Sequence, residues 1–125
     1  MEKAKIEIVE ELIRIEELCS MISFFFSKLY DIGTFREKTK YFTISKHVVF
    51  FALQRSLGRI EAIERKLDYL VYVHTINQNS VNRVMELKEM LHELEITYKK
   101  NKIKEVVNKI GEFNKEITKF KNEFI

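Results

Sequence analysis

At 125 residues the chain has the length of a single domain, residues 1–125, and it is long enough to bury a hydrophobic core without disulfides or a structural metal. Hydrophobic residues make up 46% of it and charged residues 33%, a balance that excludes a disordered tail, which would lack the apolar surface to offset the entropy of ordering. The net charge of +3 is too small by itself to indicate a polyanionic partner.

Proline is absent, and there are only three glycines, at positions 33, 58 and 111. Because these two residues most often interrupt helices, their scarcity predicts long helices joined by few turns. Cys19 is the only cysteine, so an internal disulfide is excluded and a reducing compartment is favoured. The first residues lack the apolar run of a signal peptide, and the densest apolar run, residues 18–26, is too short to span a bilayer. We therefore expect a cytoplasmic protein without a membrane partner.

The first predicted helix covers residues 3–31. Its apolar side chains recur at alternating steps of four and three residues and form a heptad seam of Ile8, Leu12, Ile15, Cys19, Ile22, Phe26 and Leu29. Further apolar residues widen this seam into the broad face of a helix that is buried on two sides, namely Val9, Ile13, Leu18, Met21 and Phe25. Gly33 can adopt the left-handed conformation that closes a helix.

Residues 34–37 read Thr-Phe-Arg-Glu, a helix-capping box, which predicts a short helical turn over residues 35–42. The central helix follows, capped by Thr43 or Ser45 and continuing to about residue 76. Gly58 lies inside it, where glycine costs about 1 kcal/mol relative to alanine. The helix either breaks there, giving a bundle of five helices, or continues with a neighbouring backbone packed close. An apolar register that continues through this glycine favours one helix: Leu53, Ile60, Ile63, Leu67 and Leu70.

The two halves of the central helix differ in pattern. Residues 47–53 are apolar on nearly every side, so we expect them at the centre of the fold, covered by Ile22, Phe25 and Phe26 and by the later helices. The second half narrows to one apolar stripe with basic residues opposite, which leaves surface for a protein partner or a second copy. The segment is thus predicted to be a core and an arm that join at Gly58.

A polar turn at residues 77–80 ends the central helix, with Ser80 as the cap of the next one. That helix carries an apolar row of Val84, Leu87, Leu91, Leu94 and Tyr98. The row slips by five residues between Tyr98 and Ile103, which rotates the apolar face away. Residues 99–102 are therefore either a tight connection or the middle of one long helix over residues 79–124, and the sequence leaves both alternatives open.

The last helix has the most regular pattern, with apolar residues at steps of three and four over three heptads: Ile103, Val106, Ile110, Phe113, Ile117, Phe120 and Phe124. The sequence thus predicts an all-α protein, an antiparallel bundle of four long helices with coiled-coil-like seams. The expected helices are unequal in length, whereas a closed monomeric bundle prefers matched ones. We therefore expect a dimer or small oligomer in which the last seam pairs between chains through Ile103, Val106, Ile110, Phe113, Ile117 and Phe120.

The sequence contains no motif typical of a catalytic, cofactor or metal site. Its three glycines stand too far apart for a phosphate-binding loop, and one cysteine cannot form a cysteine-rich zinc site. Glu89 and His92 form one E-x-x-H unit, whereas a di-iron bundle uses two with further inward glutamates. The arginine-to-histidine spacing of HEPN-type ribonucleases is shorter than the eight intervening residues of Arg65 to His74 and Arg83 to His92. We expect no enzyme, no cofactor and no metal.

Two basic clusters are the remaining candidate binding sites. The first contains Arg36, Lys38, Lys40 and Lys46 around Tyr41 and Phe42, and the second contains Lys99, Lys100, Lys102 and Lys104. Basic and aromatic side chains together can hold phosphates and stack bases. The alternative is that the lysines only solvate the surface, while the aromatic residues of the first cluster and Phe35 cover the end of the core.

One further pattern lies within residues 56–99. It consists of Ser56, Leu57, Glu61, Met90, Leu91, Leu94 and Lys99. Through it, the second half of the chain resembles small four-helix bundle proteins related to ribosomal intervening-sequence proteins and to the accessory subunits of diversity-generating retroelements. The pattern covers less than half of the chain, and the helix after Tyr98 departs from it. The resemblance favours a nucleic-acid partner and assigns no role to any residue.

The sequence supports two hypotheses about function. The first is a non-enzymatic interaction module, an adaptor, accessory subunit or inhibitor that self-associates and presents a helical surface to a protein partner. It depends on the surplus of apolar seam in so short a chain. The second is a nucleic-acid-binding bundle that contacts backbone phosphates through the two basic clusters.

Overall fold

The computed structural model describes residues 2–31, 35–72, 78–100 and 102–125, with the side chains of residues 2, 27, 29–31, 35–45 and 103 outside the description. Four helices make up nearly all of the described chain: α1 (Glu2–Asp31), α2 (Phe35–Tyr72), α3 (Gln78–Lys99) and α4 (Ile103–Asn122). The prediction of an all-α protein with four long helices is confirmed.

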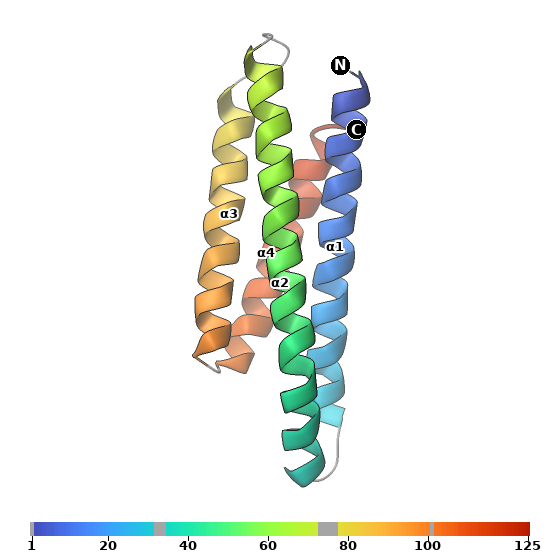
Figure 1. Ribbon diagram of the computed structural model, residues 1–125, viewed down its shortest axis with the longest axis vertical. Helices are drawn as coiled ribbons and strands as arrows, with labels where there is room; N and C mark the ends of the chain where they lie inside the picture. The colour runs from blue at the N-terminus through green and yellow to red at the C-terminus, as the bar shows by residue number, and fades with distance from the viewer. Residues whose placement is uncertain (1, 32–34, 73–77, 101) are drawn as a thin grey trace.

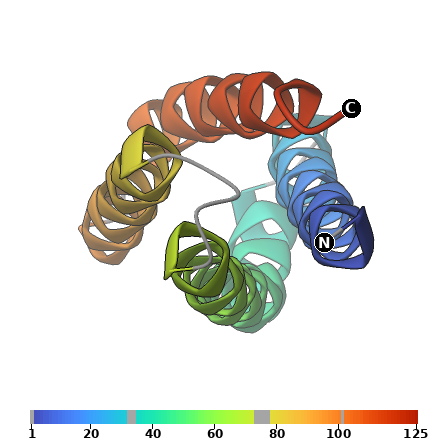
Figure 2. The ribbon, with the colours of Figure 1, turned by 90° about the horizontal axis from the view of Figure 1, so that it is seen from above.

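The helices form an antiparallel bundle in which each one packs against the next and α4 returns to α1. Viewed from above, they surround a common centre (Figure 2). Both chain ends lie at the same end of the bundle, and the connection between α3 and α4 lies toward the other (Figure 1). Among the described residues, no helix has both the length and the apolar character that crossing a membrane requires.

The predicted apolar rows are the buried rows of the structure. The core is lined by the seam of α1, the stripe of α2 from Leu53 through Leu70, the row of α3 and the last seam in α4, wherever their side chains are described. Phe124 is partly buried against the core. Ile13, expected on the broad buried face of α1, is exposed instead. The reason is that only α2 and α4 pack against α1, so part of its circumference stays uncovered.

α2 is one continuous helix of 38 residues, so the helical turn expected over residues 35–42 is part of it, and neither Thr43 nor Ser45 caps a helix. It ends at Tyr72, before the predicted residue 76. The predicted close of α1 at Gly33 lies outside the described residues. The polar turn predicted at residues 77–80 is wrong for residues 78–80, because α3 begins at Gln78 and Ser80 therefore lies inside the helix and does not cap it.

Gly58 does not break α2. A Cβ atom built at this position would meet nothing within 4 Å, so no neighbouring backbone packs close to it either. The prediction of a continuous helix is confirmed, and the helix simply tolerates an exposed glycine in its interior.

α3 and α4 are separate helices, so residues 79–124 do not form one long helix, an alternative that the sequence leaves open. The backbone N–H groups of Lys100 and Lys102 both donate to the carbonyl oxygen of Thr97, at 3.2 and 3.4 Å, and so close the end of α3. The slip in the apolar pattern after Tyr98 marks the connection between two helices that pack against each other.

α1 and α2 are much longer than their partners. At 1.5 Å per residue, their 30 and 38 residues span about 45 and 57 Å, against about 33 and 30 Å for the 22 and 20 residues of α3 and α4. The surplus length projects beyond the connection of α3 and α4 as a two-helix extension, made of the last turns of α1 and the first turns of α2 (Figure 1).

This arrangement overturns the predicted role of the first half of α2. Residues 47–53, expected at the centre of the fold, lie near the base of the extension, and Phe50 and Phe51 there are 42% and 58% exposed. Only one side of α2 faces other helices at this level, and Val49, Ala52 and Leu53 occupy that side. The second half, expected to be the arm, lies in the four-helix section instead, and its apolar stripe is buried there.

Candidate functional site

The candidate site lies where the two-helix extension leaves the four-helix section. The hydroxyl group of Tyr98 in α3 donates a hydrogen bond to the backbone oxygen of Lys46 in α2, at 3.2 Å. Burial raises the pKa of Tyr98 to about 12, so the hydroxyl group keeps its proton at neutral pH and remains a donor. The contact places one member of the first basic cluster beside the start of the second, which begins at Lys99.

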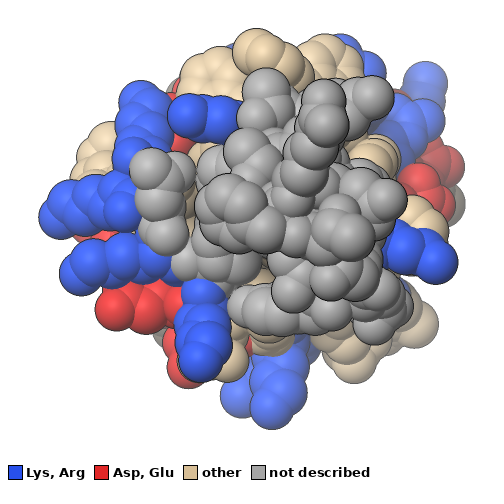
Figure 3. Space-filling model, turned by 90° about the horizontal axis from the view of Figure 1, so that it is seen from below, with Lys and Arg blue, Asp and Glu red and all other residues tan. Residues whose placement is uncertain are grey.

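We call this surface the basic end and define it by Lys46, Arg55, Lys99, Lys100, Lys102 and Lys104, together with Phe50 and Phe51. These side chains are exposed. The other members of the first predicted cluster belong to α2, but their side chains lie outside the described residues: Arg36, Lys38 and Lys40. Seen from below, lysine and arginine side chains surround this end on several sides and are more prominent than acidic ones (Figure 3).

Formal charge is distributed unevenly along the bundle. Residues 28–55 and 95–109, which supply this end, contain eleven basic and four acidic residues, a formal sum of +7. The rest of the chain contains eleven basic and fifteen acidic residues, a formal sum of −4. Because the potential near a surface depends on local charge, the net charge of +3 conceals a strongly basic end and an acidic remainder.

Two phenylalanines lie among the cations of the basic end. Lys99 Nζ lies over the Phe50 ring, 6.0 Å from its centroid, and the Arg55 guanidinium lies over the Phe51 ring at 5.7 Å. A cation over an aromatic face is attracted by the ring quadrupole, so each pair stabilises an exposed ring beside an exposed charge. The surface therefore offers positive charge for phosphates and flat apolar faces on which bases can stack.

The sequence argument missed these two rings because it assigned them to the core. A signal was present: the buried positions of α2 in this region keep the spacing of one helix face, Val49, Ala52, Leu53 and Ser56. Phe50 and Phe51 do not belong to that face. A strict helical register, rather than the density of apolar residues, would have placed both at the surface.

The cations of the basic end are available to an anion. Lys99 Nζ lies 3.3 Å from a Glu95 carboxylate oxygen and Lys102 Nζ lies 3.9 Å from one of Glu105, and both lysines are exposed. Exposed pairs of this kind contribute about 1 kcal/mol or less and exchange readily for another anion. Within the described residues, no carboxylate pairs with the other lysines of this end, Lys46, Lys100 and Lys104.

The predicted self-association seam is not at the surface. Its residues in α4 pack inside the bundle against α1 and α3: Val106, Ile110, Phe113, Ile117 and Phe120. The side chain of Ile103 lies outside the described residues. The unequal helix lengths are accommodated by the two-helix extension, so the seam does not need a second chain to be covered. Pairing through these residues would require α4 to leave the bundle.

The described residues contain no group of three or more histidine, cysteine and carboxylate side chains that could hold a metal ion. Glu89 and His92 are both exposed on α3. Cys19 is buried, and this burial, together with the nearby Glu16 carboxylate, raises the pKa of its thiol to about 12. Since the thiolate is the reactive form, Cys19 serves packing rather than chemistry.

Comparison of the chain with protein-family models, with curated proteins and with solved structures finds no match. The comparisons therefore do not support the resemblance seen in residues 56–99, and the geometry and charge of the chain are the basis for its function.

Proposed function

We propose that the protein is a non-enzymatic helical bundle that binds single-stranded nucleic acid through its basic end. The observation that carries the proposal is that Lys46 and Arg55 of α2 and the second basic cluster lie around exposed aromatic rings, at the point where Tyr98 is hydrogen-bonded to Lys46. This is the second of the two hypotheses from the sequence. The first loses the α4 seam as its surface, because that seam is buried.

The chemistry of the surface favours a single strand over a duplex. Lysines attract backbone phosphates of either form, because binding releases condensed counterions. Phe50 and Phe51 add exposed ring faces, and such faces bind bases only when the bases are free to leave their own stack. Neither contact reads base edges, so the proposal is for binding with little sequence preference.

A direct test is the affinity of the whole protein for fluorescein-labelled oligothymidylate and oligouridylate, measured by anisotropy over a range of salt concentrations. We expect binding that weakens steeply with salt, with a slope of about 0.7 in log Kd against log salt for each phosphate contact. A duplex of the same length should bind more weakly at equal salt. Affinity that does not depend on salt would contradict the proposal.

The charge contribution is tested by replacing Lys99, Lys100 and Lys102 together with glutamate. We expect the salt slope to fall by about 2, or about 0.7 for each of the three contacts. The matched control replaces three exposed lysines near the opposite end of the bundle, Lys3, Lys115 and Lys119, with glutamate, which makes the same change in net charge. Equal loss of affinity in both variants would mean that only the total charge matters, and the basic end would be rejected as the site.

The aromatic contribution is tested by Phe51→Ala. Stacking of a base on an aromatic side chain contributes about 1–3 kcal/mol, so affinity for the single strand should fall at least about 5-fold. Tyr72→Ala removes another exposed ring, far from the basic end, and should leave the affinity unchanged. If Phe51→Ala binds like the wild type, the single-strand part of the proposal is wrong.

Two predictions from the sequence accompany this proposal, namely a cytoplasmic location and self-association. A buried, free Cys19 is compatible with a reducing compartment. Self-association now needs a surface other than the α4 seam, and sedimentation of the protein over a range of concentrations tests it.

A further inference from the structure

A groove lies between α2 and α3 on the four-helix section, away from the basic end. Its volume is about 510 Å³. Along α2 it extends from Leu57 to Asp68, a separation of eleven residues or about 16 Å, which is the length of three turns of a helix. At the lower end it stops where Gln54 Nε2 donates to a Glu95 carboxylate oxygen across the two helices, at 3.2 Å.

The floor of the groove is apolar. Leu57 of α2 and Val81 and Leu91 of α3 line it, each at least partly buried against the core. Met85 stands beside them and is 55% exposed. Methionine is flexible and adapts its shape to different apolar partners, so an exposed methionine over an apolar floor is typical of a surface that receives a hydrophobic side chain.

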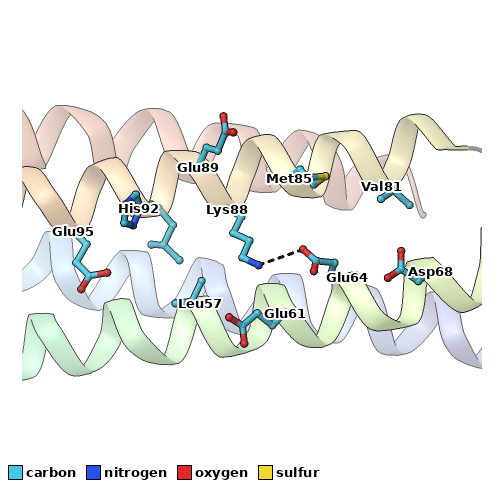
Figure 4. A pocket seen from close by; sticks show the side chains of 11 residues that line it. Leu57, Glu61, Glu64, Asp68, Val81, Met85, Lys88, Glu89, His92 and Glu95 are labelled. Carbon is cyan, nitrogen blue, oxygen red and sulfur yellow. Dashed lines mark ion pairs between the residues drawn. The ribbon is translucent and has the colours of Figure 1, made fainter.

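One wall of the groove is acidic. Glu61, Glu64 and Asp68 of α2 line it; Glu64 and Asp68 project toward α3, and Lys88 reaches back from α3 to pair with Glu64 at 3.6 Å (Figure 4). Glu89, although near the groove, points away from α2 in the same view (Figure 4). Among the described residues, no basic side chain pairs with Glu61 or Asp68.

Ion pairs also cross the other seams of the bundle. Between α1 and α2, Arg59 pairs with Glu11 at 3.0 Å, and between α1 and α4, Lys121 pairs with Glu16 at 2.7 Å. Between α3 and α4, Arg83 pairs with Glu116 at 3.5 Å. Carboxylates without a cation from the described residues also line the seam between α3 and α4, namely Glu86, Glu89 and Glu112, but Met90 is the one apolar side chain beside them. The groove between α2 and α3 therefore differs in combining such carboxylates with an apolar floor.

We infer that this groove is the docking site for a basic amphipathic helix of a protein partner. Apolar residues spaced along one face of that helix would lie on Leu57, Val81 and Met85, and its flanking lysines or arginines would pair with Glu61 and Asp68. A second copy of this chain would have to dock through a basic and apolar surface elsewhere, at the basic end or beside Lys3, Arg65 and Tyr69, and such a head-to-tail contact gives rings or filaments rather than a two-fold dimer. The groove and the basic end are separate surfaces, so this inference does not depend on the proposed nucleic-acid binding.

The probe for this inference is a synthetic helical peptide of leucine and lysine, with leucines at helical spacing on one face. Its binding to the whole protein is measured by calorimetry and compared with that of a leucine and glutamate peptide of the same pattern. We expect the lysine peptide to bind and the glutamate peptide not to bind. Lack of binding by the lysine peptide would overturn the inference.

The charged wall is tested by the double variant Glu61→Lys with Asp68→Lys. The affinity for the lysine peptide should fall by about tenfold, because two attractive pairs become repulsive. The matched control is Glu10→Lys with Glu17→Lys, two exposed carboxylates of α1, which makes the same change in net charge and should retain the wild-type affinity. Equal weakening in the two double variants would show attraction to total charge and would refute a specific site.

The apolar floor is tested by Met85→Glu. This variant adds a negative charge to an exposed position, so it would strengthen a purely electrostatic contact with a basic peptide. We expect weaker binding instead, because the peptide loses an apolar contact. Circular dichroism verifies that each variant keeps its helices. If the wild type forms oligomers that the double variant at positions 61 and 68 dissolves, the occupant is a second copy and the inference is wrong.

Discussion

The two halves of α2 show how the same kind of sequence can be used in opposite ways. The half before Gly58 contains the denser apolar sequence, yet it exposes Phe50 and Phe51 at the basic end. The half after Gly58 contains a narrow stripe, yet Leu67 and Leu70 are as completely buried as Val49 and Ala52 of the first half. The comparison teaches that position in the helical register, rather than the density of apolar residues, decides which side chains are covered.

The same comparison holds for charge. Each half has a part that lies beside α3, but the first half contributes Lys46 and Arg55 to a basic surface, and the second half contributes Glu61 and Asp68 to an acidic groove. The hydrogen bond between Gln54 and Glu95 lies between the two surfaces. One seam of the bundle therefore presents two surfaces of opposite charge.

The largest expected effect on stability is in the second half of α2. Leu67→Ala should lower the free energy of unfolding by about 2–5 kcal/mol, because it leaves a cavity in the core. Phe51→Ala, in the first half, removes a larger side chain but should cost less than about 1 kcal/mol, since this ring is mostly exposed. Urea denaturation followed by circular dichroism measures both. Similar costs for the two variants would remove the distinction between the halves.

A smaller effect is expected where the first half of α2 meets α3. Tyr98→Phe removes the hydrogen bond to Lys46 and should cost about 1 kcal/mol at neutral pH. Burial raises the pKa of Tyr98 from 10.0 to about 12, so between these pH values the folded chain keeps a proton that the unfolded chain has released. The stability that this group contributes is therefore complete below pH 10 and is lost as the pH rises through about 12.

The pH dependence is measured as the difference in unfolding free energy between the wild type and Tyr98→Phe. Lysines and Cys19 also titrate at alkaline pH, but they are present in both proteins and largely cancel in this difference. We expect the difference to shrink above pH 10. A constant difference would mean that Tyr98 is not protected from ionisation in the folded state.

The smallest effect is expected at the junction of the two halves. Gly58→Ala should raise stability by about 0.5–1 kcal/mol, because alanine favours the helix and its Cβ meets nothing within 4 Å. Gly111 in α4 has equally open surroundings, so Gly111→Ala is a matched comparison with the same expected gain. A loss of stability in Gly58→Ala alone would show that α2 needs a flexible junction between its halves.

Much of the fold could be predicted from the sequence, because a helix that packs on one side must place apolar residues at the helical period. The seams of α1 and α4 and the row of α3 were recognisable on this basis. The same argument failed at residues 47–53, where apolar residues occupy several faces and the period gives no preference among them. It also could not tell that the α4 seam is covered by α1 and α3 of the same chain.

By itself, the sequence determined an all-α fold of long helices and the buried rows of α1, α3, α4 and the second half of α2, since periodicity is a local property. It also identified the basic residues of both clusters, but it did not show how the two clusters are placed relative to each other. Only the tertiary structure brought Lys46 beside Tyr98, left Phe50 and Phe51 uncovered, and placed unpaired carboxylates along an apolar groove. These features depend on which helices become neighbours and how far each one extends, and both properties arise from contacts between residues far apart in the chain.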